Sequence, residues 1–211
     1  MTLDSLRSRI DQIDAEIHAL LMERAQTVAD IVAAKGPAPS AVVIQPAREG
    51  AVLKRRLEDH DGPLSPAIIA HIWRCVISAF CDLQRKFRVH VVGLSGAEGG
   101  MRDLARFWFG FAPALAEPAD AALAVRILER ADGDLGIVPL SATGAWWRPL
   151  SAEGVHVVGR FAAPEGQANH CLLIAGPPVA PAAGRVHLLA LRWQLAATPP
   201  PPHRLHSPAT P

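Results

Sequence analysis

The chain has 211 residues, of which 50% are hydrophobic, and it carries 21 lysine and arginine residues against 20 aspartate and glutamate residues. This apolar fraction is enough for a packed core, and the length suffices for one large domain or two small ones. The near-neutral charge excludes a protein that is drawn as a whole to nucleic acid or to an anionic membrane, so any anion must be bound by a local cluster of cations.

Targeting and metal-binding signals are missing from the sequence. The N-terminus is charged from residue 4 onward and no apolar run is long enough to span a bilayer, so we expect a cytoplasmic protein. Cys75, Cys81 and Cys171 are odd in number and lack CxxC spacing, which disfavours a disulfide framework or a zinc site. The nine histidines are scattered without a metal-binding pair, and we expect no metal.

The first predicted element is a long helix that begins at Leu3. Its apolar residues recur in alternating steps of three and four, which is a heptad seam: Leu3, Leu6, Ile10, Ile13, Ile17 and Leu20. Arg24 takes the next seam position, and the segment KGPAPS ends the helix. The helix therefore has about 30 residues and a length of roughly 45 Å. Such a helix needs a partner to cover its seam, which favours a dimer.

Two shorter helices are predicted next. One begins near Pro46 in PAREGAVLKRRLEDH, and the other begins at Ser65 with Pro66 at its first helical position. The last helix is expected to bury one apolar face: Ile69, Trp73, Val76, Phe80 and either Leu83 or Gln84. Residues 1–87 are therefore predicted to form an all-α domain.

From residue 88 onward the sequence changes to short β-rich runs. They are VHVVGL (89–94), LGIVPL (135–140), VHVVGRFA (155–162), CLLIAG (171–176) and VHLLALR (186–192). Helical segments around 101–110 and 118–130 separate them, which predicts a small α/β domain over residues 88–195. Residues 196–211 are rich in proline and poor in large apolar residues, so we expect a disordered tail.

Two cations lie on one face of the first helix. Arg24 and Lys35 are eleven residues apart, which is three turns plus about 20°. Arg7 lies roughly 25 Å from Arg24 along the axis and is turned by about 100°, so one straight helix cannot bring both to a small ligand. Two antiparallel copies of the helix can do so. An alternative for Arg24 is a snorkelling side chain or one half of an interhelical ion pair, and spacing alone does not separate these roles.

Other polar residues accompany these cations. Arg48 and Glu49 stand at the start of the second helix, and Gln84 lies on the apolar face of the third, four residues after Phe80. Buried polar groups are costly unless they are partnered. Several cations, one carboxylate and one amide in a helical bundle therefore indicate a pocket for a small polyanion with a hydroxyl or ether oxygen.

Three segments together resemble the all-helical chorismate mutases. They are LDSLRSRIDQIDAEIHALLMERAQTVADIVAAKG, VIQPAREGAVL and ISAFCDLQRKF, in the order and at nearly the spacing of that family. The resemblance covers residues 3 to 87. It implies an intertwined three-helix homodimer that converts chorismate to prephenate in aromatic amino-acid biosynthesis, with neither a metal nor another cofactor.

The resemblance also implies a role for each polar residue. Arg24 and the partner subunit's Arg7 would hold the two carboxylates of chorismate, and Arg48 would support the site. Lys35 and Gln84 would direct donors at the ether oxygen. The implied rearrangement is unimolecular and pericyclic, so catalysis comes from holding the reactive shape and from stabilising charge on that oxygen. Guanidinium groups suit carboxylates because they bind both oxygens at once.

Three further positions complete the implied site. Glu49 would take the ring hydroxyl. Gln45 belongs to the substrate-binding set but stands where the family commonly has an acidic residue, and Phe80 stands where a serine is frequent. Either change is expected to affect substrate binding, whereas the groups that act on the breaking bond are retained.

The second half carries weaker patterns. GLSGAEGG (93–100) is either an anion-binding loop or a plain turn, because it fits neither GxGxxG nor the Walker loop. Trp146 and Trp147 either line a groove or pack in the core. With GDLGIVPLSATG (133–144) and VVGRFAA (157–163), this half faintly resembles the catalytic lobe of prephenate dehydratases.

The dehydratase resemblance is incomplete. Where that family carries Thr-Arg-Phe at its catalytic strand, this chain has Gly159, Arg160 and Phe161, so the hydroxyl needed for the elimination is missing. The segment is also too short for two lobes and a regulatory domain, which favours a degenerate remnant. Chorismate mutase is thus the favoured function. A bifunctional chorismate mutase/prephenate dehydratase and a non-catalytic dimeric ligand-binding regulator are the alternatives.

Overall fold

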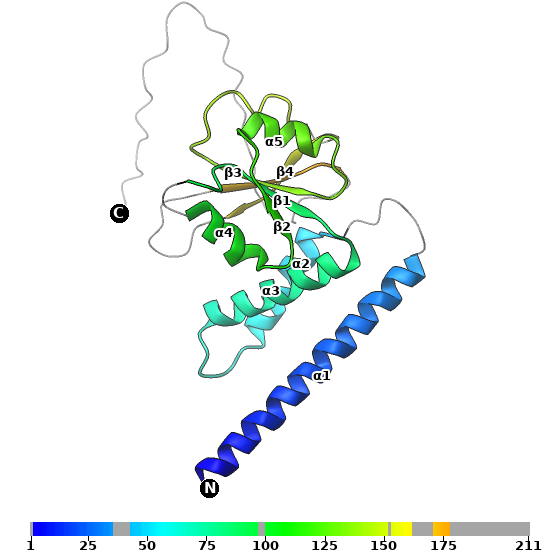
Figure 1. Cartoon of the computed structure of the whole chain (residues 1–211), viewed down its shortest axis with the longest axis vertical. Helices are drawn as coiled ribbons and strands as arrows, with labels where there is room; N and C mark the ends of the chain where they lie inside the picture. Colours follow the sequence, from blue (N-terminus) through cyan, green and yellow to red (C-terminus); the bar gives the residue numbers. More distant parts are fainter. Residues whose placement is uncertain (1, 36–42, 97–99, 152, 162–170, 178–211) are drawn as a thin grey trace, which may run out of the picture.

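The computed structural model describes residues 2–35, 43–96, 100–151, 153–161 and 171–177, in a helical half and an α/β half (Figure 1). The helical half consists of α1 (Leu3–Lys35), α2 (Pro46–Glu58) and α3 (Pro66–Gln84). The α/β half consists of β1 (Arg88–Val91), α4 (Gly100–Phe109), β2 (Ala114–Ala116), α5 (Ala121–Leu128), β3 (Leu135–Pro139), β4 (His156–Phe161) and β5 (Cys171–Ala175). The strand predicted at 186–192 and the predicted disordered tail lie outside the described residues.

Helix α1 is one continuous helix of 33 residues whose N-terminal part stands away from the rest of the chain (Figure 1). The heptad seam is uncovered in a single chain, since Leu3 is 62% exposed, Ile10 57% and Leu20 63%. Val28, in the part of α1 that approaches α3, is the one buried residue among those of the helix that the structure describes. A continuous exposed apolar stripe of this kind is typical of a surface that binds another protein chain or a membrane.

The predicted starts of α2 and α3 are confirmed. Ser65 caps α3, because its side chain accepts a hydrogen bond of 3.3 Å from the backbone N–H of Ile68. Helix α2 begins at Pro46, and the Glu49 carboxylate accepts a hydrogen bond of 3.0 Å from the backbone N–H of Gln45. Both starts satisfy backbone donors that a helix leaves free at its first turn.

The predicted buried face of α3 is only partly correct. Ile69, Trp73, Val76, Phe80 and Gln84 are half-buried, and Leu83 is 56% exposed. The buried residues of α3 are Ala70, Ser78, Cys81 and Asp82. The reason is that α3 contacts α1, α2 and α4, so its covered residues are spread over several sides of the helix.

By length and composition, α3 is the one helix in the described parts of the chain that could cross a membrane, with a mean hydropathy of 1.4. This finding runs against the expectation that no apolar run is long enough. Helix α3 nevertheless contacts α1, α2 and α4, and it carries the half-buried Arg74 and the buried Asp82. Contacts with three other helices and charged residues away from solvent are typical of a helix that packs within a folded domain.

The α/β half is built on a mixed sheet of five strands in the order β2-β1-β3-β5-β4. Strand β1 is parallel to β2 and β3, whereas β5 is antiparallel to β3 and to β4. Strand β2 has only three residues, Ala-Leu-Ala, and it was not predicted because this run lacks the β-branched and aromatic residues that mark strands. The predicted helices around 101–110 and 118–130 are confirmed as α4 and α5.

The two halves of the chain share one hydrophobic core. Helix α4 and α5 lie on opposite faces of the sheet (Figure 1), and alternate residues of β3 point to each: Ile137 packs with Leu104 of α4, and Val138 packs with Val125 of α5. The cluster on the α4 side also contains Cys81 and Phe87 from the end of the helical half. The sheet is therefore held directly against the helices that carry the predicted site.

Gly136 on β3 has no room for a side chain, and its neighbours belong to the core cluster on the α5 side of the sheet. A Cβ atom there would lie 2.7 Å from Cγ1 of Ile174 and 2.8 Å from Cδ1 of Leu128. We expect Gly136→Ala to lower the free energy of unfolding in urea by about 1–3 kcal/mol, because both neighbours are packed core side chains. Gly50→Ala is the control, since nothing lies within 4 Å of its Cβ position. Equal stability of Gly136→Ala and the parent would contradict this account.

Candidate functional site

A pocket of about 280 Å³ lies among the three helices of the helical half. Helix α1 contributes Arg24, Thr27, Val28 and Ile31, the start of α2 and the segment before it contribute Val43, Gln45, Arg48, Glu49 and Val52, and α3 contributes Ile77, Phe80, Cys81 and Gln84. Five of the predicted site residues are therefore brought together: Arg24, Gln45, Arg48, Glu49 and Gln84.

Arg24 is held over an aromatic ring at this pocket. Its Cζ atom lies 4.0 Å from the ring centroid of Phe80, a cation–π contact. The Nη1 atom is buried and has no hydrogen-bond acceptor among the described residues. Burial lowers the pKa of the guanidinium, Cys81 acts in the opposite sense, and the Arg48 cation lowers it further. A buried donor without an acceptor is costly, so an anion that enters the pocket supplies what Nη1 lacks.

Glu49 and Cys81 form the inner polar wall. Besides the Gln45 backbone N–H, the Glu49 carboxylate accepts a weak hydrogen bond from the Cys81 thiol at 3.9 Å. Burial raises the pKa of Glu49, against the opposing effect of these two donors. Burial, followed by the Glu49 charge, raises the pKa of Cys81 to about 12. Cys81 is therefore a neutral thiol and not a nucleophile.

Three other predicted residues differ in how far the structure describes them. Gln84 lines the pocket, and its Nε2 donates to the Phe80 carbonyl of its own helix at 3.4 Å. Arg48 lines the pocket from an exposed position. Lys35 is the last residue of α1, and its side chain lies outside the described part of the chain.

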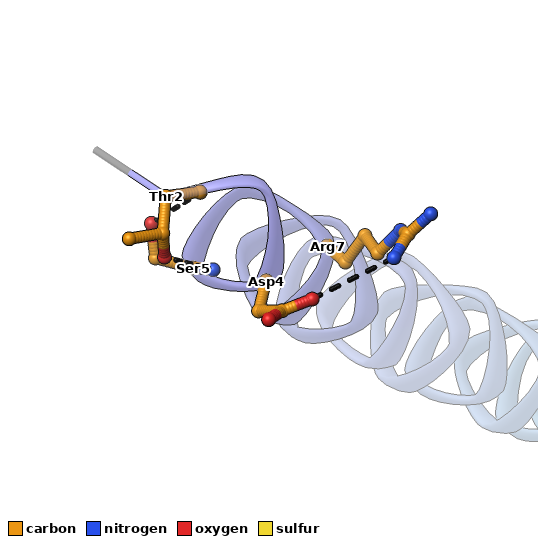
Figure 2. Close-up of polar contacts among 4 residues, drawn as sticks. All are labelled: Thr2, Asp4, Ser5 and Arg7. Atoms are coloured by element: carbon orange, nitrogen blue, oxygen red, sulfur yellow. Dashed lines mark hydrogen bonds and ion pairs between the residues drawn. The ribbon is translucent and has the colours of Figure 1, made fainter.

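Arg7 lies far from this pocket within one chain. Its Nη1 is 3.6 Å from the Asp4 carboxylate, and Figure 2 shows the pair on the outer surface of the first turns of α1. Both side chains are exposed, at 68% for Arg7 and 92% for Asp4. The seventeen residues between Arg7 and Arg24 correspond to roughly 25 Å along the helix. One chain thus brings five of the predicted residues to the pocket, but not Arg7.

The raised pKa of Glu49 gives a testable dependence of stability on pH. The folded state holds the Glu49 proton more tightly than the unfolded state does, because burial raises the pKa. The stabilisation from protonated Glu49 is present below the unfolded pKa and is lost as the pH rises through the folded pKa. We expect the free energy of unfolding of Glu49→Gln, measured relative to the parent, to increase as the pH rises above about 4.3, the usual pKa of a glutamate. A difference that does not change with pH would contradict the assignment.

The Gly-rich loop of the α/β half uses its donors within the chain. Ser95 donates its backbone N–H to the Glu117 carboxylate at 2.9 Å, and its hydroxyl donates to the other oxygen of the same group. These bonds lower the pKa of Glu117. Residues 97–99 lie outside the described part, and the described part supports a turn. Of the two tryptophans, Trp146 is buried in the core beside α5, and Trp147 is 39% exposed.

Arg74 is a polar residue of the helical half that the sequence analysis missed. It is the one charged residue in the apolar run IIAHIWRCVISAF of α3, and that isolation is the signal that could have found it. Its Cζ lies 3.9 Å from the Trp108 ring centroid, and its Nε is buried with no hydrogen-bond partner among the described residues. No group of three or more histidine, cysteine, aspartate or glutamate residues that could hold a metal is found in these same residues.

A comparison with protein families matches residues 6–85 to chorismate mutase type II. This segment contains α1 from its first turns, the whole of α2 and the whole of α3. The helical half is thus similar in sequence to this family over the residues that line the pocket, with the predicted partner residue Arg7 included.

Curated relatives carry the name bifunctional chorismate mutase/prephenate dehydratase. The protein of Stutzerimonas stutzeri is 39% identical over 98 residues, which are 44% of this chain and 27% of the relative. That of Neisseria gonorrhoeae is 38% identical over 99 residues, which are 45% of this chain and 26% of the relative. The protein of Aquifex aeolicus is 32% identical over 146 residues, 67% of this chain and 39% of the relative.

The chain spans between about a quarter and two fifths of the length of these relatives. The match to the Aquifex aeolicus protein is longer than the segment matched by the family, so it extends into the α/β half. No solved structure matches the chain.

Proposed function

We propose that this chain is a chorismate mutase, which rearranges chorismate to prephenate within one molecule and without a cofactor. The observation that carries the proposal is the convergence of Arg24, Arg48, Glu49 and Gln84 on one pocket of about 280 Å³. The match of residues 6–85 to chorismate mutase type II supports it. Chorismate is a dianion, and the buried Nη1 of Arg24 is a donor that a carboxylate would satisfy.

Each pocket residue is assigned a role in this proposal. Arg24 holds one substrate carboxylate. The Phe80 ring packs against the Arg24 guanidinium and limits its orientation. Gln84 and Lys35 direct donors at the ether oxygen, where negative charge develops as the carbon–oxygen bond lengthens. Glu49 takes the ring hydroxyl.

Two more residues complete the proposed binding set. Arg48 adds positive charge at the rim, and Gln45 holds its backbone N–H on the Glu49 carboxylate. Gln45 is a neutral side chain where the family commonly has an acid, so it adds no charge that would repel a dianion.

We further propose that the active form is a homodimer whose subunits pair antiparallel along α1. The exposed seam of α1 supports this, because burying it stabilises the pair by about 25 cal/mol for each Å² of apolar surface. Antiparallel pairing brings the partner subunit's Arg7 beside the middle of α1, where Arg24 lies. Arg7 then supplies the second carboxylate contact.

The proposed domain organisation follows the two halves of the chain. Residues 1–87 form the mutase domain, residues 88–195 form a degenerate dehydratase-like domain, and residues 196–211 form a tail. The three cysteines are free thiols, which fits a protein of the reducing cytoplasm.

One assay on the purified chain tests the proposal. Chorismate loss and product identity are followed together by absorbance and chromatography, with no added cofactor. Accumulation of prephenate is the expected result. Unchanged chorismate would contradict the proposal and would favour a ligand-binding regulator.

The same assay addresses a bifunctional enzyme. The long match to the Aquifex aeolicus protein is the observation in its favour, because it reaches into the α/β half. Gly159 stands against it, since a glycine has no hydroxyl for the elimination. We expect prephenate to persist, and conversion to phenylpyruvate would show that the α/β half is active.

A further inference from the structure

A second pocket, of about 220 Å³, lies where the helical half meets the α/β half. Its walls are mostly apolar: Leu53 of α2, Ile77 of α3, Trp108 of α4, Val158 of β4 and Leu173 of β5. Pockets for drug-sized ligands usually measure roughly 300–1,000 Å³, so this one suits a smaller molecule. Glu49 and Ile77 border both this pocket and the first one.

Two arginines line this second pocket, the half-buried Arg74 and the exposed Arg160. Arg74 is the one that is built into the wall. Its guanidinium stacks on Trp108 at 3.9 Å and lies 5.7 Å from the Phe107 ring centroid. Burial lowers the pKa of Arg74, and the described residues offer it neither an ion pair nor an acceptor for its Nε. Glu49, the acidic residue on the shared wall, turns its carboxylate to Gln45 and Cys81 instead. A desolvated cation without an anion is costly, and an anionic ligand would remove that cost.

Gly159 keeps the pocket open on the sheet side. Strand β4 is at the edge of the sheet, and its pairing with β5 shifts between Val157 and Gly159, so that Val158 is an extra residue in a bulge. Gly159 pairs with Leu173, whose side chain lines the pocket. A Cβ at Gly159 would meet Leu173 at 3.8 Å, an ordinary contact, so the backbone tolerates a side chain there. The fold therefore does not require a glycine at position 159. Because Gly159 has no side chain, this part of the pocket stays open.

We propose that this pocket binds a small monocarboxylate with a flat apolar body, with the carboxylate on Arg74 and the body between Trp108 and Leu173. The half-buried guanidinium of Arg74 matches the single carboxylate, the exposed Arg160 adds positive charge at the edge, and the apolar walls bury the remainder of the ligand. This site lies outside the proposed mutase pocket, and the inference does not depend on chorismate turnover.

The test is calorimetric titration of the full chain with phenylacetate. Phenylacetamide, which has the same shape without the charge, and acetate, which has the charge without the ring, are the control probes. We expect phenylacetate to bind about tenfold more tightly than phenylacetamide, the usual difference for a hydrogen bond to a charged group. It should also bind more tightly than acetate, which has no apolar body to bury. Equal binding of phenylacetate and phenylacetamide, or no binding of phenylacetate, would overturn the proposal.

Matched variants then locate the binding. Gly159→Val fills the pocket and is expected to weaken phenylacetate binding at least tenfold, with Gly159→Ala in between. Arg74→Gln should remove the preference for phenylacetate over phenylacetamide. Arg148→Gln, an exposed arginine beside the core of the opposite sheet face, is the charge-matched control and should bind like the parent.

The first pocket also holds an arginine, so Arg24→Gln distinguishes the two sites. We expect it to keep the affinity of the parent for phenylacetate. Affinity lost in Arg24→Gln but kept in Gly159→Val would place the probe in the first pocket and refute the second site. If thermal melting shows that Arg74→Gln is not folded, the Gly159 variants and the comparison of the three probes decide whether phenylacetate binds in the second pocket.

Discussion

Replacing Arg24 by glutamine is expected to lower kcat/KM for chorismate at least a hundredfold while the chain stays folded. Arg24 is the residue whose Nη1 is buried at the pocket without an acceptor, and it is fixed in place by the Phe80 ring. Removing one such preorganised donor typically costs about 3 kcal/mol of transition-state stabilisation. Glutamine retains a polar side chain but loses both the charge and the second parallel donor.

Steady-state kinetics with circular dichroism and size-exclusion chromatography make this measurement. Arg9→Gln is the matched control, because Arg9 lies on α1 but its side chain is 58% exposed and contacts only Gln12 and Glu16 among the described polar groups. It should retain the turnover of the parent. Near-normal turnover in a folded Arg24→Gln would refute the assignment of this pocket as the mutase site. Lys35→Ala, the second proposed donor from α1, is expected to lose activity to a similar extent.

Two inactive variants are expected to restore activity when they are mixed. In the proposed dimer each site takes Arg24 from one subunit and Arg7 from the other, so Arg7→Ala and Arg24→Ala are each inactive alone. A mixed dimer of the two has one site with both arginines intact and one site with neither. Random exchange of equal amounts makes half of the dimers mixed, so the mixture should recover about a quarter of the parent activity.

The mixing experiment needs proof that subunits exchange. Differently tagged chains, unfolded together and refolded, report the fraction of mixed dimers by affinity capture. Arg7→Ala mixed with itself is the control and should stay inactive. Mixed dimers that form without any recovery would show that Arg7 and Arg24 do not share a site. A chain that stays monomeric at assay concentrations would remove the role of Arg7 altogether.

Much of the helical half could be predicted because its signals are local. The heptad seam, the Pro46 start and the Ser65 cap each depend on a few neighbouring residues, and all three are found in the structure. The pocket could be anticipated because polar residues on an apolar face have few ways to be satisfied. Arg24 and Glu49 do meet at one pocket, as that reasoning expected.

The missed features depend on contacts between distant parts of the chain. The buried residues of α3 depend on its contacts with α1, α2 and α4, and no local pattern in α3 reports how these neighbours are arranged. The isolation of Arg74 in its apolar run is visible in the sequence, whereas its contact with Trp108, a residue of another helix, is not. Strand β2 is a strand because β1 offers it an edge, whereas its own three residues favour no strand. The pairing of α1 with a second chain stays a prediction, because one chain alone leaves that seam uncovered.

The core shared across residue 88 limits how this molecule can be cut. Cys81 and Phe87 pack with Val89 and Leu135 of the sheet, so a fragment that ends at residue 87 would bare the back wall of the first pocket to water. The α/β half thus stabilises the C-terminal end of α3, whether or not it has an activity of its own. A shortened chain with only the helical half would need polar residues in place of the apolar residues that this cut exposes. A shorter chain would therefore need a new cover for the side of α3 that carries Cys81.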